Sequence, residues 1–369
     1  MPVVSVDIPL RKSFASYEVV IGKGRISNIQ KNLPEGLNNE KAVILADDNL
    51  PAQLTDCLKK GLGAPSGEAE ILVYSFKSGE SAKNIETVTR LYDFMIENGL
   101  ERGHPVFSLG GGVTGDIAGF VAATYLRGVP YIQVPTTLLA MVDASIGGKT
   151  GYNHPKGKNL IGAFYQPDLV VADTGALQTL SSREFRSGMA ECIKHALIAD
   201  WELFEWMEEN ISSILNLKEG ALNTLIERNV RIKADIVCKD ERESGARALL
   251  NLGHTYGHAI EVCCGYGHYT HGEAVAMGCI AACALAEKLD IAPSGLLERA
   301  CGLIEKTGLP VKGRLPEKSE LMAAMRRDKK VKSGRLRLVL PTGYGVADIF
   351  PDISSSDIQD SWDFVSQKQ

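Results

Sequence analysis

The stretch that decides the fold is residues 108–162, SLGGGVTGDIAGFVAATYLRGVPYIQVPTTLLAMVDASIGGKTGYNHPKGKNLIG. The apolar run 105–109 leads into it and predicts a buried strand, and residues 110–115 then hold four glycines. A strand that feeds a glycine turn and then a helix lets backbone N–H groups close on a phosphate, with support from the helix dipole. The spacing Gly-x-Gly-x-x-Gly matches the dinucleotide-binding pattern, which is a weak signal by itself.

The second half of this stretch strengthens the prediction. Residues 143–159 combine an aspartate, glycines, three lysines and asparagines within seventeen positions. Such a mixture of charged, amide and glycine residues is not typical of a hydrophobic core. Two polar glycine loops, about one crossover unit apart, therefore indicate two anionic ligands side by side.

Length and composition narrow the function class. A chain of 369 residues favours two domains, and 44% hydrophobic with 23% charged residues is typical of a globular protein. A net charge of −5 argues against a nucleic-acid partner. We expect no membrane partner, because no segment reaches 18 apolar residues and the N-terminus does not resemble a signal peptide. The eight cysteines contain no C-x-x-C pair, which predicts free thiols and a cytoplasmic protein.

The first 180 residues alternate strands with helices. Residues 3–8 and 17–22 predict two short strands in an N-terminal ribbon, 41–46 and 71–76 predict two more strands, and 50–62 and 81–98 show helical spacing. This order predicts a parallel sheet with ligands outside the carboxyl ends of its strands. The polar residues that fall at such ends are Asp47, Asn49, Glu80 and Lys83.

Two details depart from the usual dinucleotide fold. The glycine loop comes after about four strands, and no acidic residue closes a strand about 20 residues later, as that fold requires. Asp47 is the better candidate for a ribose partner.

The pattern changes near residue 180. Ser181 is placed to cap a helix, and helical periods follow to about 330, before a terminal ribbon at 335–349. We therefore predict a Rossmann-like α/β domain over 1–180 and a helical domain over 181–369.

Four of the seven histidines lie between 254 and 271. His254 and His258 are four residues apart, His271 begins the next predicted helix, and Glu191 lies on an earlier one. Histidine and carboxylate ligands with an open position suit a catalytic zinc ion, but structural histidines are as plausible on spacing alone. The spacing also does not choose among His195, His254, His258, His268 and His271.

A charged run precedes these histidines. We interpret residues 231–251 as a helix that places Arg247 and Asn251 one and two turns from His254 or His258. A solvated charged face is the alternative interpretation.

Five segments together resemble the 3-dehydroquinate synthase family, a group of sugar-phosphate cyclases. The resemblance runs in order from about residue 41 to 340, and it is carried by GGGVTGDIAGFVAATYLRG, QVPTTLLAMVDASIGGKTGYNHPKGKNLIGAFYQP, GMAECIKHALI, DERESGARALLNLGHTYGHAIE and HGEAVAMG. It implies an N-terminal Rossmann-like domain, a helical C-terminal domain and an active site in the cleft between them.

The resemblance also implies roles for individual residues. The ligands of a zinc ion would be Glu191, His254 and His271. Co²⁺ is the alternative ion for this site. Contacts to the substrate and its phosphate and carboxylate would come from Asp143, Lys149, Asn159, Lys194, Lys233, Arg247, Asn251, His258 and one of Lys329 and Lys330. NAD contacts would come from Asp47, Asn49, Glu80, Lys83, Gly111, Gly112, Val113, Asp116, Thr136, Thr137 and Lys158. Arg127 would reach the phosphate site of the neighbouring subunit in a homodimer, and His195 is left without a role, packed or facing solvent.

The implied reaction converts 3-deoxy-D-arabino-heptulosonate 7-phosphate to 3-dehydroquinate and phosphate in the shikimate pathway. Hydride transfer from C5 to NAD acidifies the C6 proton, phosphate leaves, the hydride returns, and an aldol closure forms the ring. The alternatives are another sugar-phosphate cyclase, a metal-dependent polyol dehydrogenase and a non-catalytic nucleotide-binding regulator. A neutral polyol needs no set of cations such as Lys149, Lys194, Lys233 and Arg247, and a regulator needs no metal ligands.

Overall fold

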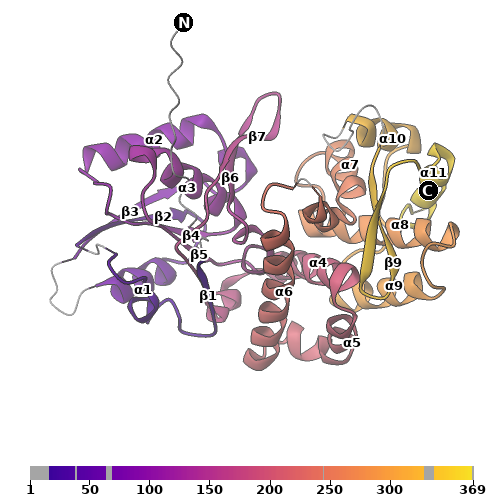
Figure 1. The fold of residues 1–369 in the computed structure, drawn as a ribbon, viewed down its shortest axis with the longest axis horizontal. Helices are drawn as coiled ribbons and strands as arrows, with labels where there is room; N and C mark the ends of the chain where they lie inside the picture. The colour runs from indigo at the N-terminus through magenta and orange to yellow at the C-terminus, as the bar shows by residue number, and fades with distance from the viewer. Residues whose placement is uncertain (1–15, 38–39, 64–68, 244, 328–335, 368–369) are drawn as a thin grey trace, which may run out of the picture.

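A computed structural model describes residues 16–367 except 38–39, 64–68, 244 and 328–335. The predicted strand at 3–8 lies outside the described residues. Figure 1 shows a sheet-containing N-terminal half beside a helical C-terminal half, with α4 (Ser182–Ala199) and α6 (Glu219–Lys239) on the side of the helical half that faces the sheet.

A six-stranded parallel sheet forms the N-terminal half, in the order β1-β8-β5-β4-β2-β3. Its strands are β1 Glu18–Ile21, β2 Lys41–Asp47, β3 Glu70–Phe76, β4 Val106–Gly110, β5 Tyr131–Pro135 and β8 Leu169–Ala172. The strands predicted at 41–46, 71–76 and 105–109 are confirmed. The segment 17–22 is also a strand, but it lies at the sheet edge, parallel to β8.

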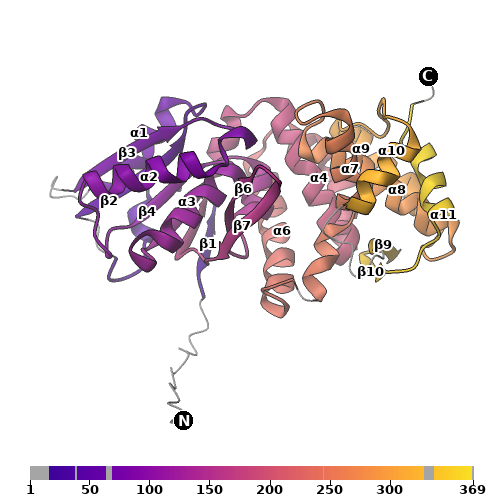
Figure 2. The ribbon, with the colours of Figure 1, turned by 90° about the horizontal axis from the view of Figure 1, so that it is seen from above.

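Helices cover both faces of this sheet, which is why β4 and β5 are buried throughout. Alternate residues of β2 point to opposite faces: Val43 and Leu45 pack with α2 (Ile85–Glu97) and α3 (Gly112–Thr124). Ile44 and Ala46 pack with α1 (Ala52–Leu62) in a core that continues into the helical half. Figure 1 shows α2 and α1 on opposite sides of the sheet, and Figure 2, seen from above, shows α2 in front of it. The strand–glycine–helix prediction is confirmed, since α3 starts two residues after β4.

The polar stretch around residue 150 forms a β-hairpin, where the sequence indicated a loop. Strands β6 (Lys149–His154) and β7 (Gly157–Phe164) pair antiparallel as a separate sheet. Glycines allow this pairing, because a Cβ on Gly151 would lie 2.3 Å from the Ile161 carbonyl oxygen and one on Gly162 would lie 2.2 Å from that of Thr150. The hairpin rises between the two halves in Figure 1.

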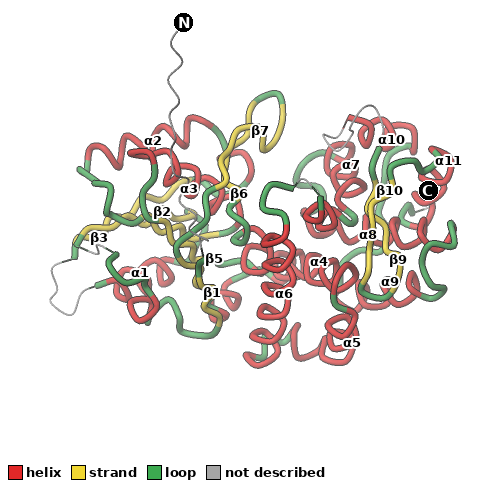
Figure 3. The backbone as a smooth tube through the Cα atoms, in the orientation of Figure 1, coloured by secondary structure: helices red, strands yellow, loops and turns green. Residues whose placement is uncertain are grey.

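The C-terminal half is mainly helical, as predicted (Figure 3). After α4 and α6 come α7 His254–Cys264, α8 His271–Lys288, α9 Leu296–Thr307, α10 Lys318–Arg327 and α11 Ser355–Ser361, with α5 Trp201–Leu215 between α4 and α6. Ser181 caps α4 by accepting a hydrogen bond from the Glu184 N–H at 3.2 Å. The predicted terminal ribbon is the antiparallel pair β9 (Leu338–Gly343) and β10 (Val346–Phe350).

The single helix expected over 231–251 was wrong. Helix α6 ends at Lys239, a short 3-10 helix spans Ala246–Asn251, and α7 begins after Gly253. The Asp240 carboxylate stabilises the break, because it accepts hydrogen bonds from the backbone N–H groups of Gly245 (2.7 Å) and Arg247 (3.1 Å). Gly253 has φ +74° and contacts α8 so closely that a Cβ would lie 2.7 Å from Cys279 Sγ. Arg247 and Asn251 therefore belong to this short 3-10 helix and not to a continuous helix that runs on from α6.

Gly272 sets the distance between α4 and α8. A Cβ there would lie 1.9 Å from the Ser187 carbonyl oxygen. We expect Gly272→Ala to destabilise the protein by about 3 kcal/mol, because a backbone atom cannot move aside as a side chain does. Gly302→Ala in α9 is the matched control: it has nothing within 4 Å and should be neutral or stabilise by up to about 1 kcal/mol. Calorimetric melting of both variants tests this, and equal melting temperatures would contradict it.

Candidate metal and substrate site

Three side chains from three helices of the helical half converge on one point. Glu191 lies in α4, His254 is the first residue of α7, and His271 is the first residue of α8. Glu191 Oε1 is 3.6 Å from His254 Nε2 and 3.7 Å from His271 Nε2, and all three donor atoms lie within 4.8 Å of one another. These distances are too long for hydrogen bonds. The buried Glu191 Oε1 has no hydrogen-bond partner among the described residues.

The other polar atoms of the three side chains are oriented by neighbours. His254 Nδ1 donates to the Leu252 carbonyl at 3.1 Å, and His271 Nδ1 lies 3.4 Å from Glu261 Oε2. Glu191 Oε2 accepts a hydrogen bond from Lys194 Nζ. A histidine whose Nδ1 carries the proton and donates it to a neighbour keeps a free lone pair on Nε2. In His254 and His271 this lone pair is then available to the cluster.

This donor set fits a divalent metal ion. Three ligand atoms that are each about 2 Å from a tetrahedral zinc ion lie roughly 3.3 Å apart, close to the observed separations. An otherwise unsatisfied buried carboxylate oxygen is also costly unless something pairs with it. The fold brings together the three residues that the family resemblance implied as ligands, and a second group of possible ligands, Asp143, Glu191 and His195, shares Glu191 with them.

Asp143 lies near Glu191 of this cluster and also lines the neighbouring cavity. Its Oδ1 accepts a hydrogen bond from Lys233 Nζ at 2.6 Å and lies 3.8 Å from Nε2 of His195, which is fully buried. Burial alone would raise the pKa of Asp143, but the ammonium groups of Lys233 and Lys194 outweigh it and hold that pKa well below its usual value. The fold packs His195 inside the protein. There, burial and the ammonium group of Lys194 lower the pKa of His195.

A cavity of about 530 Å³ opens beside Asp143, between the two halves. Lys149 lines it from the hairpin, and Lys233 and Arg247 line it from the helical half. The Arg247 guanidinium is buried and donates from Nη2 to the Gly147 carbonyl at 3.1 Å. Gly147 has φ +92°, and a Cβ there would lie 2.4 Å from Arg247 Nη2, so only glycine fits. The carboxylates of Asp116, Asp143 and Glu243 line the same cavity, where Lys233 bonds to Asp143 and Lys149 to Glu243. An anionic ligand would compete with these carboxylates for the three cations.

The remaining predicted substrate residues, apart from Asn251, divide into three groups. Asp143 and Asn159 also line the cavity. Lys194 and His258 lie at the metal cluster, where the His258 ring centroid is 5.8 Å from that of His254. Exposed Arg127 follows α3 in a 3-10 turn, and Lys329 and Lys330 lie outside the described residues.

Most predicted NAD residues gather at the carboxyl ends of β2 to β5. Asp47 ends β2, Gly111 caps α3 next to Thr137, and Lys83 Nζ bonds to Asp116 and, at 2.5 Å, to Asn159 Oδ1. Asn49 and Thr136 follow β2 and β5, Glu80 begins a 3-10 helix after β3, and Gly112 and Val113 are the first residues of α3. Lys158 differs, because its Nζ lies 3.8 Å from the ring centroid of Tyr266 in the C-terminal half.

Two carboxylates at the site were missed as functional candidates. Glu243 pairs with Lys149, and its Oε1 accepts a hydrogen bond from Asn251 Nδ2 at 2.7 Å. No sequence signal separated it from the other charges of the run. Glu261 contacts His271, and its position seven residues after His254 places both on one helix face, a signal that the sequence contained.

Solved structures with this fold define the class of protein. The chain superposes on 2-epi-5-epi-valiolone synthase from Streptomyces hygroscopicus, solved with NAD+ and Zn²⁺ bound, with a TM-score of 0.86, 29% identity and 98% of each chain covered. It superposes on 2-deoxy-scyllo-inosose synthase, complexed with carbaglucose-6-phosphate, NAD+ and Co²⁺, with a TM-score of 0.85, 27% identity and coverage of 93% and 95%. The protein has the fold of the sugar-phosphate cyclases. A protein described as a probable glycerol dehydrogenase, from Sinorhizobium meliloti (TM-score 0.67, 17% identity, covering 94% of this chain and 95% of its own), shares the fold alone.

Sequence comparisons name the family. The model of the 3-dehydroquinate synthase N-terminal region matches residues 73–187, and that of the C-terminal region matches 188–331. The chain is 48% identical to the 3-dehydroquinate synthase of Nitrosomonas europaea, covering 90% of this chain and 89% of that one, and 47% identical to that of Prochlorococcus marinus, covering 93% and 94%. The chain belongs to the 3-dehydroquinate synthase family, and it is an enzyme that catalyses a cyclisation.

None of the helices in the described residues has the length and apolar character needed to cross a membrane. All eight cysteines are free thiols, and three of them are buried.

Proposed function

We propose that this protein is a 3-dehydroquinate synthase, a carbon–oxygen lyase that converts 3-deoxy-D-arabino-heptulosonate 7-phosphate to 3-dehydroquinate and phosphate in the shikimate pathway. The observation that carries the proposal is the cavity beside Asp143, where Lys149, Lys233 and Arg247 surround a space that adjoins the Glu191–His254–His271 cluster. A phosphorylated, carboxylated sugar needs such cations, whereas a neutral polyol does not. Family membership supports the same activity.

The cofactors of the proposed reaction are NAD and one divalent ion, Zn²⁺ with Co²⁺ as an alternative. Glu191, His254 and His271 would hold the ion, and the carboxyl ends of β2 to β5 would hold NAD. The related synthases solved with NAD+ and Zn²⁺ or Co²⁺ support both assignments. We further propose a cytoplasmic homodimer whose substrate is a small anionic sugar phosphate.

The cations of the site bind and orient this substrate. Arg247 presents a buried planar fork that suits a carboxylate or phosphate, and its bond to Gly147 keeps it rigid. Lys233 and Lys149 add positive charge from opposite walls of the cavity, so that the anion is held while its ring reacts. Orientation of this kind contributes several kcal/mol, on the order of 7–11 in the best cases.

Bound NAD+ would supply the hydride acceptor, and a bound metal ion would polarise the reacting hydroxyls. The chain's own groups keep the surrounding charges balanced. Asp143 stays ionised between Lys194 and Lys233, because both ammonium groups hold its pKa low. The substrate phosphate is itself able to accept the C6 proton, so the reaction needs no strong base from the protein.

The test is an assay of phosphate release from the heptulosonate phosphate, with product identification by mass spectrometry. The expected product is 3-dehydroquinate. The controls are sedoheptulose 7-phosphate, glucose 6-phosphate and glycerol, which represent the other cyclases and the polyol dehydrogenases. Turnover of one of these controls, without turnover of the heptulosonate phosphate, would overturn the proposal.

A further inference from the structure

One carboxylate in α7 stands between the metal cluster and the β6–β7 hairpin. Glu261 lies two helical turns after His254, so the two side chains share one face of α7. Its carboxylate is largely buried, with 13% of the side chain exposed. Oε2 is 3.4 Å from His271 Nδ1, and Oε1 is 4.0 Å from Lys158 Nζ. The two oxygens of one side chain therefore face different halves of the molecule.

The His271 ring needs such a partner. Its backbone is fixed, because Thr270 caps α8 in a capping box with Glu273 and Gly272 packs against Ser187. The backbone does not fix which ring nitrogen carries the proton. A carboxylate at Nδ1 accepts only, so it keeps the proton on Nδ1 and the lone pair on Nε2, which lies 3.7 Å from Glu191 Oε1.

The second histidine of the cluster is oriented differently. His254 Nδ1 donates to the backbone carbonyl of Leu252, which no side-chain substitution removes. A change at Glu261 therefore acts on one ligand only and leaves the other two in place.

The opposite oxygen of Glu261 connects it to the N-terminal half. Lys158, near the start of β7, reaches across to α7 and lies over the ring of Tyr266. Its ammonium group sits at the outer limit of an ion pair with Glu261. The position of the hairpin that carries Lys149 is thereby linked to the carboxylate that orients His271.

We propose that Glu261 is a positioning residue: it holds His271 in the tautomer and orientation that bind the ion, and Lys158 ties that contact to the β6–β7 hairpin. The inference rests on the proposed metal-dependent function, and it assigns a role to a residue outside the three ligands. Loss of an outer-shell partner typically weakens metal binding by about 10–100-fold.

The experiment measures the Zn²⁺ dissociation constant of the full-length protein by competition with a chromogenic chelator. Glu261→Gln keeps the shape of the side chain and should weaken binding by about 10–100-fold, while Glu261→Asp should restore part of the loss. Lys158→Met should weaken binding by about two- to fivefold in the wild-type background and not at all in Glu261→Gln. The Co²⁺-loaded Glu261→Gln protein should also show a shifted visible spectrum, which reports the geometry at the ion.

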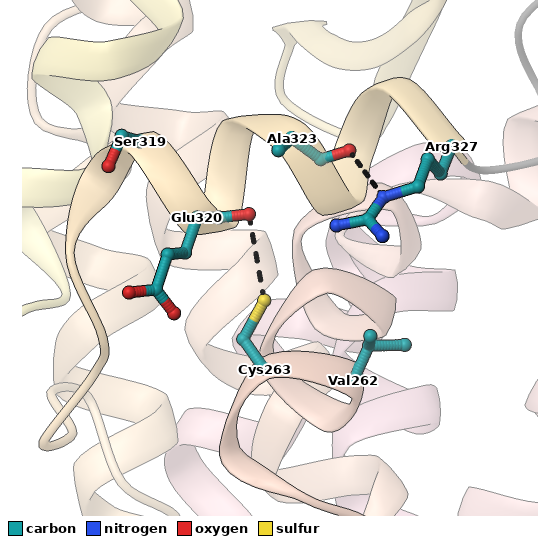
Figure 4. A pocket seen from close by; sticks show the side chains of 6 residues that line it. All are labelled: Val262, Cys263, Ser319, Glu320, Ala323 and Arg327. Atoms are coloured by element: carbon teal, nitrogen blue, oxygen red, sulfur yellow. Dashed lines mark hydrogen bonds between the residues drawn. The ribbon is translucent and has the colours of Figure 1, made fainter.

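Glu320→Gln is the matched control. Glu320 lies in α10 over another part of α7, where Figure 4 shows its side chain at a groove of about 450 Å³ with Val262, Cys263 and Arg327. This variant removes the same charge from the neighbourhood without touching His271, and its Zn²⁺ affinity should equal that of the wild type.

His271→Ala distinguishes a failure of the Glu261 role from a failure of the metal centre. If His271→Ala loses zinc but Glu261→Gln binds it as tightly as the wild type with an unchanged Co²⁺ spectrum, the role of Glu261 is refuted and the metal centre stands. If His271→Ala retains wild-type affinity, the metal assignment in the proposed function fails instead. A Glu261→Gln protein that melts below the wild type without a change in Zn²⁺ affinity also refutes the proposal.

Discussion

Replacing His271 with alanine should remove both the bound metal and the activity. The three donor atoms of the cluster come from three different helices, and Glu191 Oε1 faces the two Nε2 atoms at 3.6 and 3.7 Å. Two remaining ligands cannot complete a catalytic site, which needs three protein ligands and one open position. We expect the zinc content to fall from one per chain to near zero, and kcat to fall by more than about 100-fold. Elemental analysis of the dialysed variant and the phosphate-release assay measure the two effects.

His258→Ala is the matched control for this variant. His258 lies four residues after His254 on α7, but it does not join the group of donor atoms around Glu191. It should therefore keep its zinc while its turnover falls by about 100-fold, because the family resemblance implies that its imidazole faces the substrate. Full activity of His271→Ala after thorough metal removal would contradict the metal requirement. Zinc loss in His258→Ala alone would exchange the roles of the two histidines.

Phosphate release should continue long after the amount of phosphate exceeds the amount of NAD supplied. In the proposed mechanism the hydride leaves C5 and returns to it, so each cycle regenerates NAD. With NAD equimolar to the enzyme and far below the substrate concentration, a typical turnover of about 10 per second should make phosphate exceed NAD by more than about 100-fold within a minute. The near-ultraviolet absorbance of NADH should not rise meanwhile.

A dehydrogenase with this fold would behave in the opposite way. It would release one NADH per turnover and stop when NAD ran out. Stoichiometric NADH, with phosphate release that ends at the same point, would contradict the cyclase mechanism. A variant of the NAD site, Gly111→Val, serves as the control, because a Cβ at Gly111 already lies 3.3 Å from Thr137 Cγ2. It should need far more NAD for the same rate while its zinc content stays unchanged.

Much of the fold was predictable because local patterns reflect local physics. The alternation of strand and helix, the glycine turn before α3 and the Ser181 cap each depend on residues within one or two turns of each other. The helix expected over 231–251 failed for the same reason. Its end depends on Asp240, which bonds to backbone groups five and seven residues away, and on the packing of Gly253 against α8. Helical periodicity carries no signal for either contact.

By itself, the sequence determined the parallel sheet, the helical half, the family and a set of candidate residues. It left five histidines equivalent on spacing, because spacing along a helix does not report which faces of separate helices meet. The tertiary structure decided that Glu191, His254 and His271 lie together although α4 and α8 are far apart in the chain, and it buried His195 away from solvent. It also turned the polar stretch around Lys149 into a hairpin and placed Glu261 beside His271. These contacts arise from the packing of α4, α7 and α8 around Gly253 and Gly272, where only a residue without a side chain lets the helices come close enough.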